Sequence, residues 1–371
     1  MKIEFSKKEI YQKDIKNVEK VIKSGWLTHG EFTQKFENKF ANFTQSKYCL
    51  TVSSCTAALH LSCIVAGFKK GDEVIVPAMT HVATAHAVEL TGAKAIVADI
   101  DYVSGNLNLQ NIKKNITKKT KGIILVHMAG TPCEMNKIIQ LTKKLNLTLI
   151  EDCAHALGTK FNKKHVGNFG ITGCFSFYPT KQITTGEGGA IITNDKKIFK
   201  RLKELKAFGI DKDIKSRKIP GDYDVKSLGL NYRLTDFQAA LGYNQISNYS
   251  KNLSSRKKNA RRFSDNLKKI DEIDFPKFNN SNSYFVFQIL SKHRNKIIKK
   301  FKKINIGFSI HYLNPINQMT YYKKKNNFKL KDYKNANKYS KNVISLPVYP
   351  KLKIKEIDFI CKSIQEAINE K

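Results

Sequence analysis

The sequence predicts an α/β protein with a mostly parallel sheet in a large domain and a smaller α+β domain at its C-terminus. Over the first 250 residues, short apolar, β-prone segments alternate with helical segments. Continuous apolar strands separated by helices are typical of a parallel sheet that is covered on both faces. The chain has 371 residues and so exceeds one typical core. We therefore expect two domains, residues 1–250 and 251–371.

The elements follow one another in a regular order. The predicted strands of the large domain are 48–52, 73–77, 94–100, 122–127, 147–153, 173–177 and 190–193. Helices are expected between them; the first begins near Ala57, in a run of strong helix formers. A charge-rich helix at 251–270 marks the change of domain. After it we predict strands at 284–290 and 308–312, and helices at 294–303 and 355–369.

The net charge of +35 raises the question of a nucleic-acid partner. Only seven of the 66 basic residues are arginine, whereas surfaces that read bases favour the planar guanidinium group. The lysines are scattered among Asn and Ile, which indicates a compositional bias. We therefore predict no nucleic-acid partner. A non-catalytic basic binding or regulatory protein is the alternative from another class.

Cysteine usage and hydropathy indicate the compartment. The seven cysteines are odd in number, and none forms a Cys-x-x-Cys pair. This argues for reduced thiols in the cytoplasm, and against a disulfide framework or a zinc site; no metal is predicted. The N-terminus has no apolar stretch typical of a signal peptide, and no segment is apolar enough for a membrane helix, so we expect no membrane insertion.

One lysine differs from the others in its position. Lys181 follows the predicted strand at 173–177 and precedes the turn Gly186-Glu187-Gly188-Gly189. The end of a strand holds a side chain rigidly, which suits an amine that must meet one reactive carbon. The alternative is a solvated surface charge, the usual role of a lysine.

Polar residues follow other strands as well, where ligands of parallel sheets bind. The turn at residues 54–56 opens a helix, so its amides favour a phosphate, although Ser or Thr there can also simply cap the helix. Asp152 ends an apolar strand and either caps the next segment or pairs with a cation such as a protonated pyridine. Ser176 lies five residues before Lys181. Together these residues point to pyridoxal 5'-phosphate (PLP).

Motifs along almost the whole chain resemble the DegT/StrS family of PLP-dependent nucleotide-sugar aminotransferases, which have the aspartate aminotransferase fold (type I). They are, in order, Ser24-Gly25-Trp26-Leu27-Thr28-His29-Gly30, Ser54-Cys55-Thr56-Ala57-Ala58, Glu73-Val74-Ile75-Val76-Pro77, Glu151-Asp152-Cys153-Ala154-His155, Pro179-Thr180-Lys181-Gln182, Gly229-Leu230-Asn231-Tyr232-Arg233 and Leu346-Pro347-Val348-Tyr349-Pro350. The resemblance implies that fold, PLP as cofactor and pyridoxamine phosphate as its intermediate form.

The resemblance also implies roles at the cofactor ring. Lys181 would attach the cofactor covalently, and Asp152 would pair with the pyridine nitrogen. His155, which is Gln in many relatives, would lie against the phenolic oxygen of the ring. His81 occupies the position of the residue that stacks on the ring, although a lone histidine is more often structural.

The phosphate would be held by Ser176, Thr56 and the amides of Ser54 and Cys55. Asn231 resembles the asparagine that reaches the phosphate of the neighbouring subunit, which implies a homodimer with shared sites. Many relatives have Gly at the position of Cys55. A positive φ there would strain a cysteine. We expect instead that Cys55 belongs to the first helical turn.

Four further residues are candidates for substrate contacts: Trp26, Glu187, Arg233 and His311. Trp26 lies in the segment that resembles the N-terminal substrate loop of the family. Arg233 and His311 could contact the sugar nucleotide or the amino donor, or could equally serve as a structural ion pair or packed surface residues.

Retention of Lys181 favours amination, because sugar dehydratases of this family carry histidine there. The expected substrates are L-glutamate and a nucleotide-linked keto-sugar. We expect this sugar to be a 4-keto-6-deoxyhexose. The turn Gly186-Glu187-Gly188-Gly189 resembles members that aminate carbon-4; a carbon-3 aminotransferase is the alternative. Such products feed O-antigen and lipopolysaccharide biosynthesis.

Overall fold

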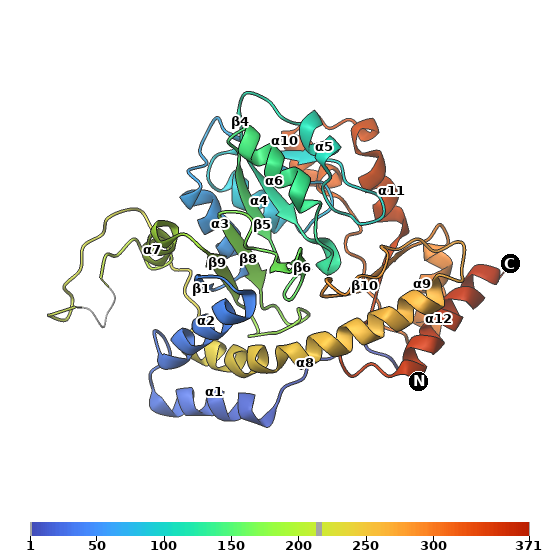
Figure 1. Cartoon of the computed structure of the whole chain (residues 1–371), viewed down its shortest axis with the longest axis horizontal. Coiled ribbons are helices and arrows are strands. Elements are labelled where there is room, and N and C mark those ends of the chain that lie inside the picture. The colour runs from blue at the N-terminus through green and yellow to red at the C-terminus, as the bar shows by residue number, and fades with distance from the viewer. Residues whose placement is uncertain (1, 213–216, 371) are drawn as a thin grey trace.

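The computed structural model describes residues 2–212 and 217–370 and is built around a central sheet (Figure 1). The sheet has seven strands in the order β1-β9-β8-β5-β4-β2-β3. These strands are β1 (Tyr48–Val52), β2 (Glu73–Pro77), β3 (Lys94–Ala98), β4 (Thr120–Val126), β5 (Thr148–Asp152), β8 (Thr172–Ser176) and β9 (Gly189–Thr193). Only β9 runs antiparallel to its neighbours in this sheet. The predicted mostly parallel sheet is confirmed.

Both faces of the sheet are buried, as the apolar strands predict. Val74 and Val76 of β2 pack in one cluster with α3 (Cys55–Val65) and α4 (Ala83–Glu89). Ile75, which lies between them, packs in another cluster with residues of α5 (Leu109–Lys114) and α6 (Met135–Lys144). Alternate side chains of a strand point to opposite faces. The strand ends that carry the site are thus held between two layers of helices.

The helix predicted at 251–270 is the second half of a longer one. Helix α8 (Asp236–Leu267) has 32 residues, so the division expected near residue 250 falls inside it. The signal for its true start is a capping box, in which the side chain of Gln238 accepts hydrogen bonds from the backbone N–H and the hydroxyl of Thr235. In Figure 1, α8 runs from between α1 (Gln12–Ser24) and α2 (Glu31–Thr44) to α12 (Ile354–Asn369).

The C-terminal part has a core of its own. Phe263 of α8 packs there with Phe287, Ile344 and Ile360, and the N-terminal residue Ile3 completes the cluster. Its small antiparallel sheet consists of β10 (Phe287–Leu290) and β11 (Val343–Leu346). Helix α9 (Arg294–Lys303) and helix α12 agree with the predicted ranges, whereas α10 (Thr320–Lys325) and α11 (Lys334–Asn342) were not predicted.

The strand predicted at 308–312 is wrong. This segment makes only an isolated bridge between Ser309 and Ser345. Just before it, the backbone of Ile3 bonds to the carbonyl of Asn305 at 3.0 Å and to the N–H of Gly307 at 2.7 Å. The N-terminal segment thus pairs with residues 305–307, and the chain after Ser309 turns toward the large domain, where the N–H of Tyr312 donates to the sulfur of Met79.

Helix α7 (Lys196–Leu205) follows β9 and lies near the edge of the molecule, where the chain extends outward (Figure 1). Within the described residues, no helix is both long enough and apolar enough to cross a membrane.

Candidate active site

A cavity of about 490 Å³ opens at the carboxyl ends of β5 and β8. Ten of the thirteen predicted site residues line it: Ser54, Cys55, Thr56, His81, Asp152, His155, Ser176, Lys181, Glu187 and His311. The two that lie farthest apart in the sequence, Ser54 and His311, are separated by 257 positions (311 minus 54). The fold therefore gathers most of the predicted residues into one place.

The loop that carries Lys181 is fixed by its own hydrogen bonds. The backbone N–H of Lys181 donates to the carbonyl of Tyr178 at 2.9 Å. The side chain of Gln182 donates to the carbonyl of His155 at 2.9 Å, which ties the loop to the end of β5. The Nζ atom of Lys181 lies 4.5 Å from the centre of the Phe285 ring. The amine is thus held above an aromatic face inside the cavity.

Burial lowers the pKa of Lys181 to about 8, and the nearby Cys55 and Asp152 oppose the shift. A lysine in water has an ordinary pKa of 10.5. A larger fraction of this amine is therefore neutral near neutral pH, and only the neutral amine is nucleophilic.

We expect the rate of covalent capture of PLP by the cofactor-free protein to depend on this shift. The rate should rise with pH through about 8 and then level off, because the pKa of Lys181 is lowered to that value. The measurement is borohydride trapping at a series of pH values, with the labelled peptide identified by mass spectrometry. A rate that still climbs toward pH 10, as for an exposed lysine, would contradict the assignment.

Asp152 lies at the end of β5 and is 4% exposed. One carboxylate oxygen accepts a hydrogen bond from the Thr84 hydroxyl at 2.9 Å, and the other accepts from the N–H of Ala154 at 3.1 Å. Burial raises the pKa of Asp152, although both hydrogen bonds oppose the shift. A buried carboxylate is stabilised by a cation, and each of its oxygens can accept a further hydrogen bond. A protonated ring nitrogen fits this position.

The turn at 54–56 is both a helix cap and an anion site. The Ser54 hydroxyl accepts a hydrogen bond from the N–H of Ala57 at 3.1 Å. The side chain of Ser54 therefore caps the helix, which was the alternative to phosphate binding. Cys55 is the first residue of α3, and its φ is not positive, as predicted. The first amides of a helix have no acceptor within it. A Cβ on Gly189 would lie 2.6 Å from the backbone of Ser54, so this glycine lets β9 approach the turn closely.

His155 lies flat against an aromatic wall. Its ring stacks on Phe285 at 4.4 Å between centroids, and its Nε2 atom is 3.3 Å from the Tyr312 hydroxyl. Burial lowers the pKa of His155 well below its ordinary value, and Lys181 adds to this shift, so the imidazole is neutral. A neutral ring that is fixed by stacking can pack against a flat ligand without adding charge.

The other two histidines of the cavity differ in burial: His311 lies deeper than His81. His311 bonds through Nδ1 to the Ser345 hydroxyl at 2.9 Å, and burial, followed by the charges of Lys181 and His81, lowers its pKa to about 3. His81 is exposed at the rim, with its ring 6.1 Å from that of Tyr312. The rim position agrees with a residue that covers a ligand.

Comparison with known proteins agrees with this geometry. Residues 8–365 match the model of the DegT/DnrJ/EryC1/StrS aminotransferase family. The chain belongs to this family. It is 34% identical to GDP-perosamine synthase of Escherichia coli O157:H7 over 97% of this chain and 96% of that protein. It is 32% identical to the spore coat polysaccharide biosynthesis protein SpsC of Bacillus subtilis, over 97% and 95% of the two chains.

Solved structures of aminotransferases share the fold. A putative sugar aminotransferase of Streptococcus pneumoniae, solved in its PMP form, superposes with a TM-score of 0.91 at 28% identity, covering 98% of each chain. PseC of Helicobacter pylori, an aminotransferase involved in the biosynthesis of pseudoaminic acid, gives 0.89 at 28% identity over 99% of each chain. Membership makes this protein an aminotransferase of the predicted fold type I, and it implies PLP as the cofactor.

Three predicted residues of this aminotransferase do not line the cavity. Trp26 is 51% exposed, and Asn231 is also exposed. Arg233 lines a different pocket together with His29, and its guanidinium carbon lies 5.1 Å from the centre of the Phe208 ring. Within the described chain, these three side chains therefore lie apart from the cavity.

Three residues that sequence reasoning missed belong to the site. Thr84 binds Asp152, Phe285 lies beneath Lys181, and Tyr312 contacts His155. Thr84 lies three residues after His81, and Tyr312 directly follows His311. The predicted residues therefore indicated the segments in which these two residues lie. Phe285 carries no sequence signal, because only tertiary packing brings it beneath the lysine.

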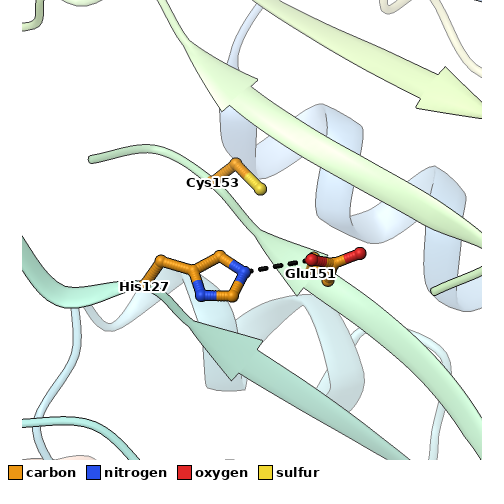
Figure 2. Close-up of side chains that lie close together, drawn as sticks. All are labelled: His127, Glu151 and Cys153. Carbon is orange, nitrogen blue, oxygen red and sulfur yellow. Dashed lines mark hydrogen bonds and ion pairs between the residues drawn. The ribbon is translucent and has the colours of Figure 1, made fainter. Parts of the chain in front are cut away.

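Behind the cavity, the buried carboxylate of Glu151 joins β5 to the residue that follows β4 and to the segment that precedes β8. Figure 2 shows His127, Glu151 and Cys153 close together, with His127 bonded to Glu151. Glu151 accepts hydrogen bonds from His127 at 3.0 Å and from the amides of Gly167, Phe169 and Gly170 at 2.7 to 2.8 Å. Burial alone raises the pKa of Glu151, yet these bonds hold it below its ordinary value. Although the three residues could hold a metal ion, the carboxylate is already satisfied by protein donors.

We expect Glu151→Gln to destabilise the protein by about 3 kcal/mol or more, since a neutral amide cannot satisfy four donors. Glu151 precedes Asp152 on β5, so the loss also loosens the cofactor site. Urea unfolding measures the effect. The matched control is Glu134→Gln, an exposed carboxylate paired with Lys137, which should change the free energy of unfolding by less than about 0.5 kcal/mol. Equal effects of the two variants would contradict the role of Glu151.

Proposed function

We propose that this aminotransferase moves the amino group of L-glutamate to a nucleotide-linked keto-sugar. The observation that carries the proposal is the cavity itself, in which the amine of Lys181 and the buried carboxylate of Asp152 face one space. The relatives support the substrate class, because one is a GDP-perosamine synthase and another takes part in the biosynthesis of pseudoaminic acid.

The residues present fit PLP. Asp152 would hold its ring nitrogen, the amides of Cys55 and Thr56 with Ser176 its phosphate, and Lys181 its aldehyde carbon. When bound, the cofactor supplies an aldehyde that accepts an amino group and a ring that withdraws electrons. The close approach of Gly189 to Ser54 leaves the phosphate turn free of a side chain from β9.

The chain's own groups orient the reactants and move protons. The lowered pKa of Lys181 allows its amine to take a proton from a substrate carbon near neutral pH and to return it elsewhere. Asp152 keeps a bound cation in place, and Thr84 and Ala154 hold its carboxylate fixed. Neutral His155 and Tyr312 form a flat wall that brings no charge into the cavity.

We further propose amination at carbon-4 of a 4-keto-6-deoxyhexose, as in perosamine-type sugars. The proposal is supported by the turn Gly186-Glu187-Gly188-Gly189, which places Glu187 at the cavity, and by the synthase relative. The test is incubation with L-glutamate and GDP-, UDP- or dTDP-linked 4-keto sugars, and with the matching 3-keto sugars, followed by mass spectrometry and NMR of the product. Amination of 3-keto sugars alone would assign the enzyme to carbon-3 instead.

We also propose that the enzyme is a homodimer that shares residues between its sites. Asn231 and Arg233 lie on an outer face next to exposed apolar side chains, among which Leu228 is 93% exposed and Val225 is 54% exposed. A second subunit that covers this face would bring both polar residues to its neighbour's cavity. A cytoplasmic location stays a prediction.

We expect Leu228→Asp to give a monomer with little activity, because a charge would then have to be buried in the interface. Light scattering gives the mass and the product assay gives the activity. The matched control is Leu330→Asp, a similarly exposed leucine elsewhere, which should leave both unchanged. A monomeric wild-type protein with full activity would refute the shared site.

A further inference from the structure

Two basic side chains, Lys8 and Arg256, have buried nitrogen atoms and no role in the proposal so far. Lys8 belongs to the N-terminal segment, and Arg256 belongs to α8. The Nζ atom of Lys8 is buried and has no hydrogen-bond partner, and the Nε atom of Arg256, a residue that is 3% exposed, has none either. Each buried group of this kind costs free energy unless an acceptor completes it.

Contacts connect Arg256 and the N-terminal segment that carries Lys8 to the wall of the cavity. Arg256 donates through Nη1 to the carbonyls of Tyr284 and Phe285 at 3.3 Å, and the Phe285 ring lies beneath Lys181. The charges of Arg256 and Lys181 both act on Lys8. Phe5, three positions before Lys8, stacks on His311 of the cavity wall at 6.1 Å.

The described part of the chain supplies no anion to Lys8. The nearest acid in sequence, Glu9, accepts a hydrogen bond from the Tyr11 hydroxyl at 2.8 Å and lies 3.9 Å from Lys351. Burial, with Arg256 and Lys181, lowers the pKa of Lys8 to about 6. A ligand with a negative charge would raise the pKa of Lys8, so that its amine is protonated. The ligand would also accept hydrogen bonds from the unpartnered nitrogens of Lys8 and Arg256.

We propose that Lys8 and Arg256 form an anion subsite that takes a carboxylate of the amino donor. The inference rests on the proposed transamination, because it names where one of its two substrates is held. A diphosphate is the other anion that the reaction offers. We favour the carboxylate, because the open nitrogens of Lys8 and Arg256 are buried, whereas a nucleotide needs the open rim where His81 and Glu187 are exposed.

The test compares Lys8→Met with Lys7→Met, which removes an exposed lysine one position away. Calorimetry measures the affinity of the PLP-loaded proteins for glutarate, which has two carboxylates and no amine to transfer. We expect Lys8→Met to weaken glutarate roughly 10- to 100-fold, the loss for a hydrogen bond to a charged group. Lys7→Met should bind glutarate normally, and the affinities for UDP and GDP should not change in either variant.

Thermal unfolding shows whether the variant is folded. We expect the midpoint of Lys8→Met to equal or exceed that of the wild type, because methionine replaces an unpaired buried amine. Lys8→Gln, which keeps a polar but neutral side chain, repeats the binding test if the methionine variant does not fold.

Three results would overturn the subsite: unchanged glutarate affinity in both Lys8 variants, a loss of UDP or GDP affinity in place of glutarate affinity, or no glutarate binding by the wild type. The proposed function fails separately. A protein that binds PLP and glutarate through Lys8 but aminates no keto-sugar would refute the sugar substrate and leave the carboxylate subsite standing.

Discussion

Lys181→Ala should abolish transamination, with a loss of about 10³-fold or more in turnover, while PLP still binds noncovalently. The variant removes the amine that attaches the cofactor and moves the proton, and each of these tasks alone is worth orders of magnitude in rate. It leaves Asp152, the 54–56 turn and Ser176, which line the same cavity, to hold the ring and the phosphate. Product formation and retention of PLP after gel filtration measure the two effects.

A matched control separates this lysine from its many neighbours. Lys196→Ala removes a lysine at the start of α7, away from the cavity, and should leave turnover unchanged. Full activity in Lys181→Ala would refute the assignment, and an equal loss in both variants would point to a general effect of charge.

Asp152→Asn should reduce turnover by roughly 10² to 10³, the usual cost of removing one preorganised electrostatic partner from a site. Asparagine is close in size but carries no charge, so a protonated ring nitrogen loses its counter-ion. It also replaces one acceptor oxygen with a donor, facing either the Thr84 hydroxyl or the Ala154 amide. Steady-state kinetics with saturating PLP measures the loss.

Thr84→Val serves as the comparison for this variant. It removes one hydrogen bond to Asp152 but leaves its charge, so we expect a smaller loss of about tenfold. If Thr84→Val and Asp152→Asn lose the same activity, Asp152 contributes through the position of its side chain and not through its charge. An Asp152→Asn enzyme with wild-type kinetics would remove the carboxylate from the mechanism.

The central sheet could be predicted from local pattern alone. β1 and β2 begin and end where predicted, because each is an apolar run bounded by polar residues or a turn. The strand at 308–312 could not be excluded from sequence, since its residues are β-prone and only tertiary contacts, such as that of Tyr312 with Met79, turn the segment away from β11. Helices α10 and α11 are short, with six and nine residues, and contain few apolar residues, so their pattern is too brief to reveal them.

The site was predictable to the extent that it lies at strand ends. Lys181 and Asp152 follow apolar strands, and their meeting follows from the parallel order of β5 and β8. Phe285 was not predictable, because it reaches the site from a distant part of the chain through the packing of the C-terminal part against the large domain. The resemblance named the residues of the family's motifs but could not indicate positions that lie outside those motifs.

The most direct test is the visible absorbance of the PLP-loaded protein through two successive additions. L-glutamate should remove the absorbance of the bound aldehyde form, and a nucleotide-linked 4-keto sugar should then restore it, as the two halves of a transamination require. A spectrum that glutamate leaves unchanged, or a purified protein that stays colourless after PLP is added, would contradict the account.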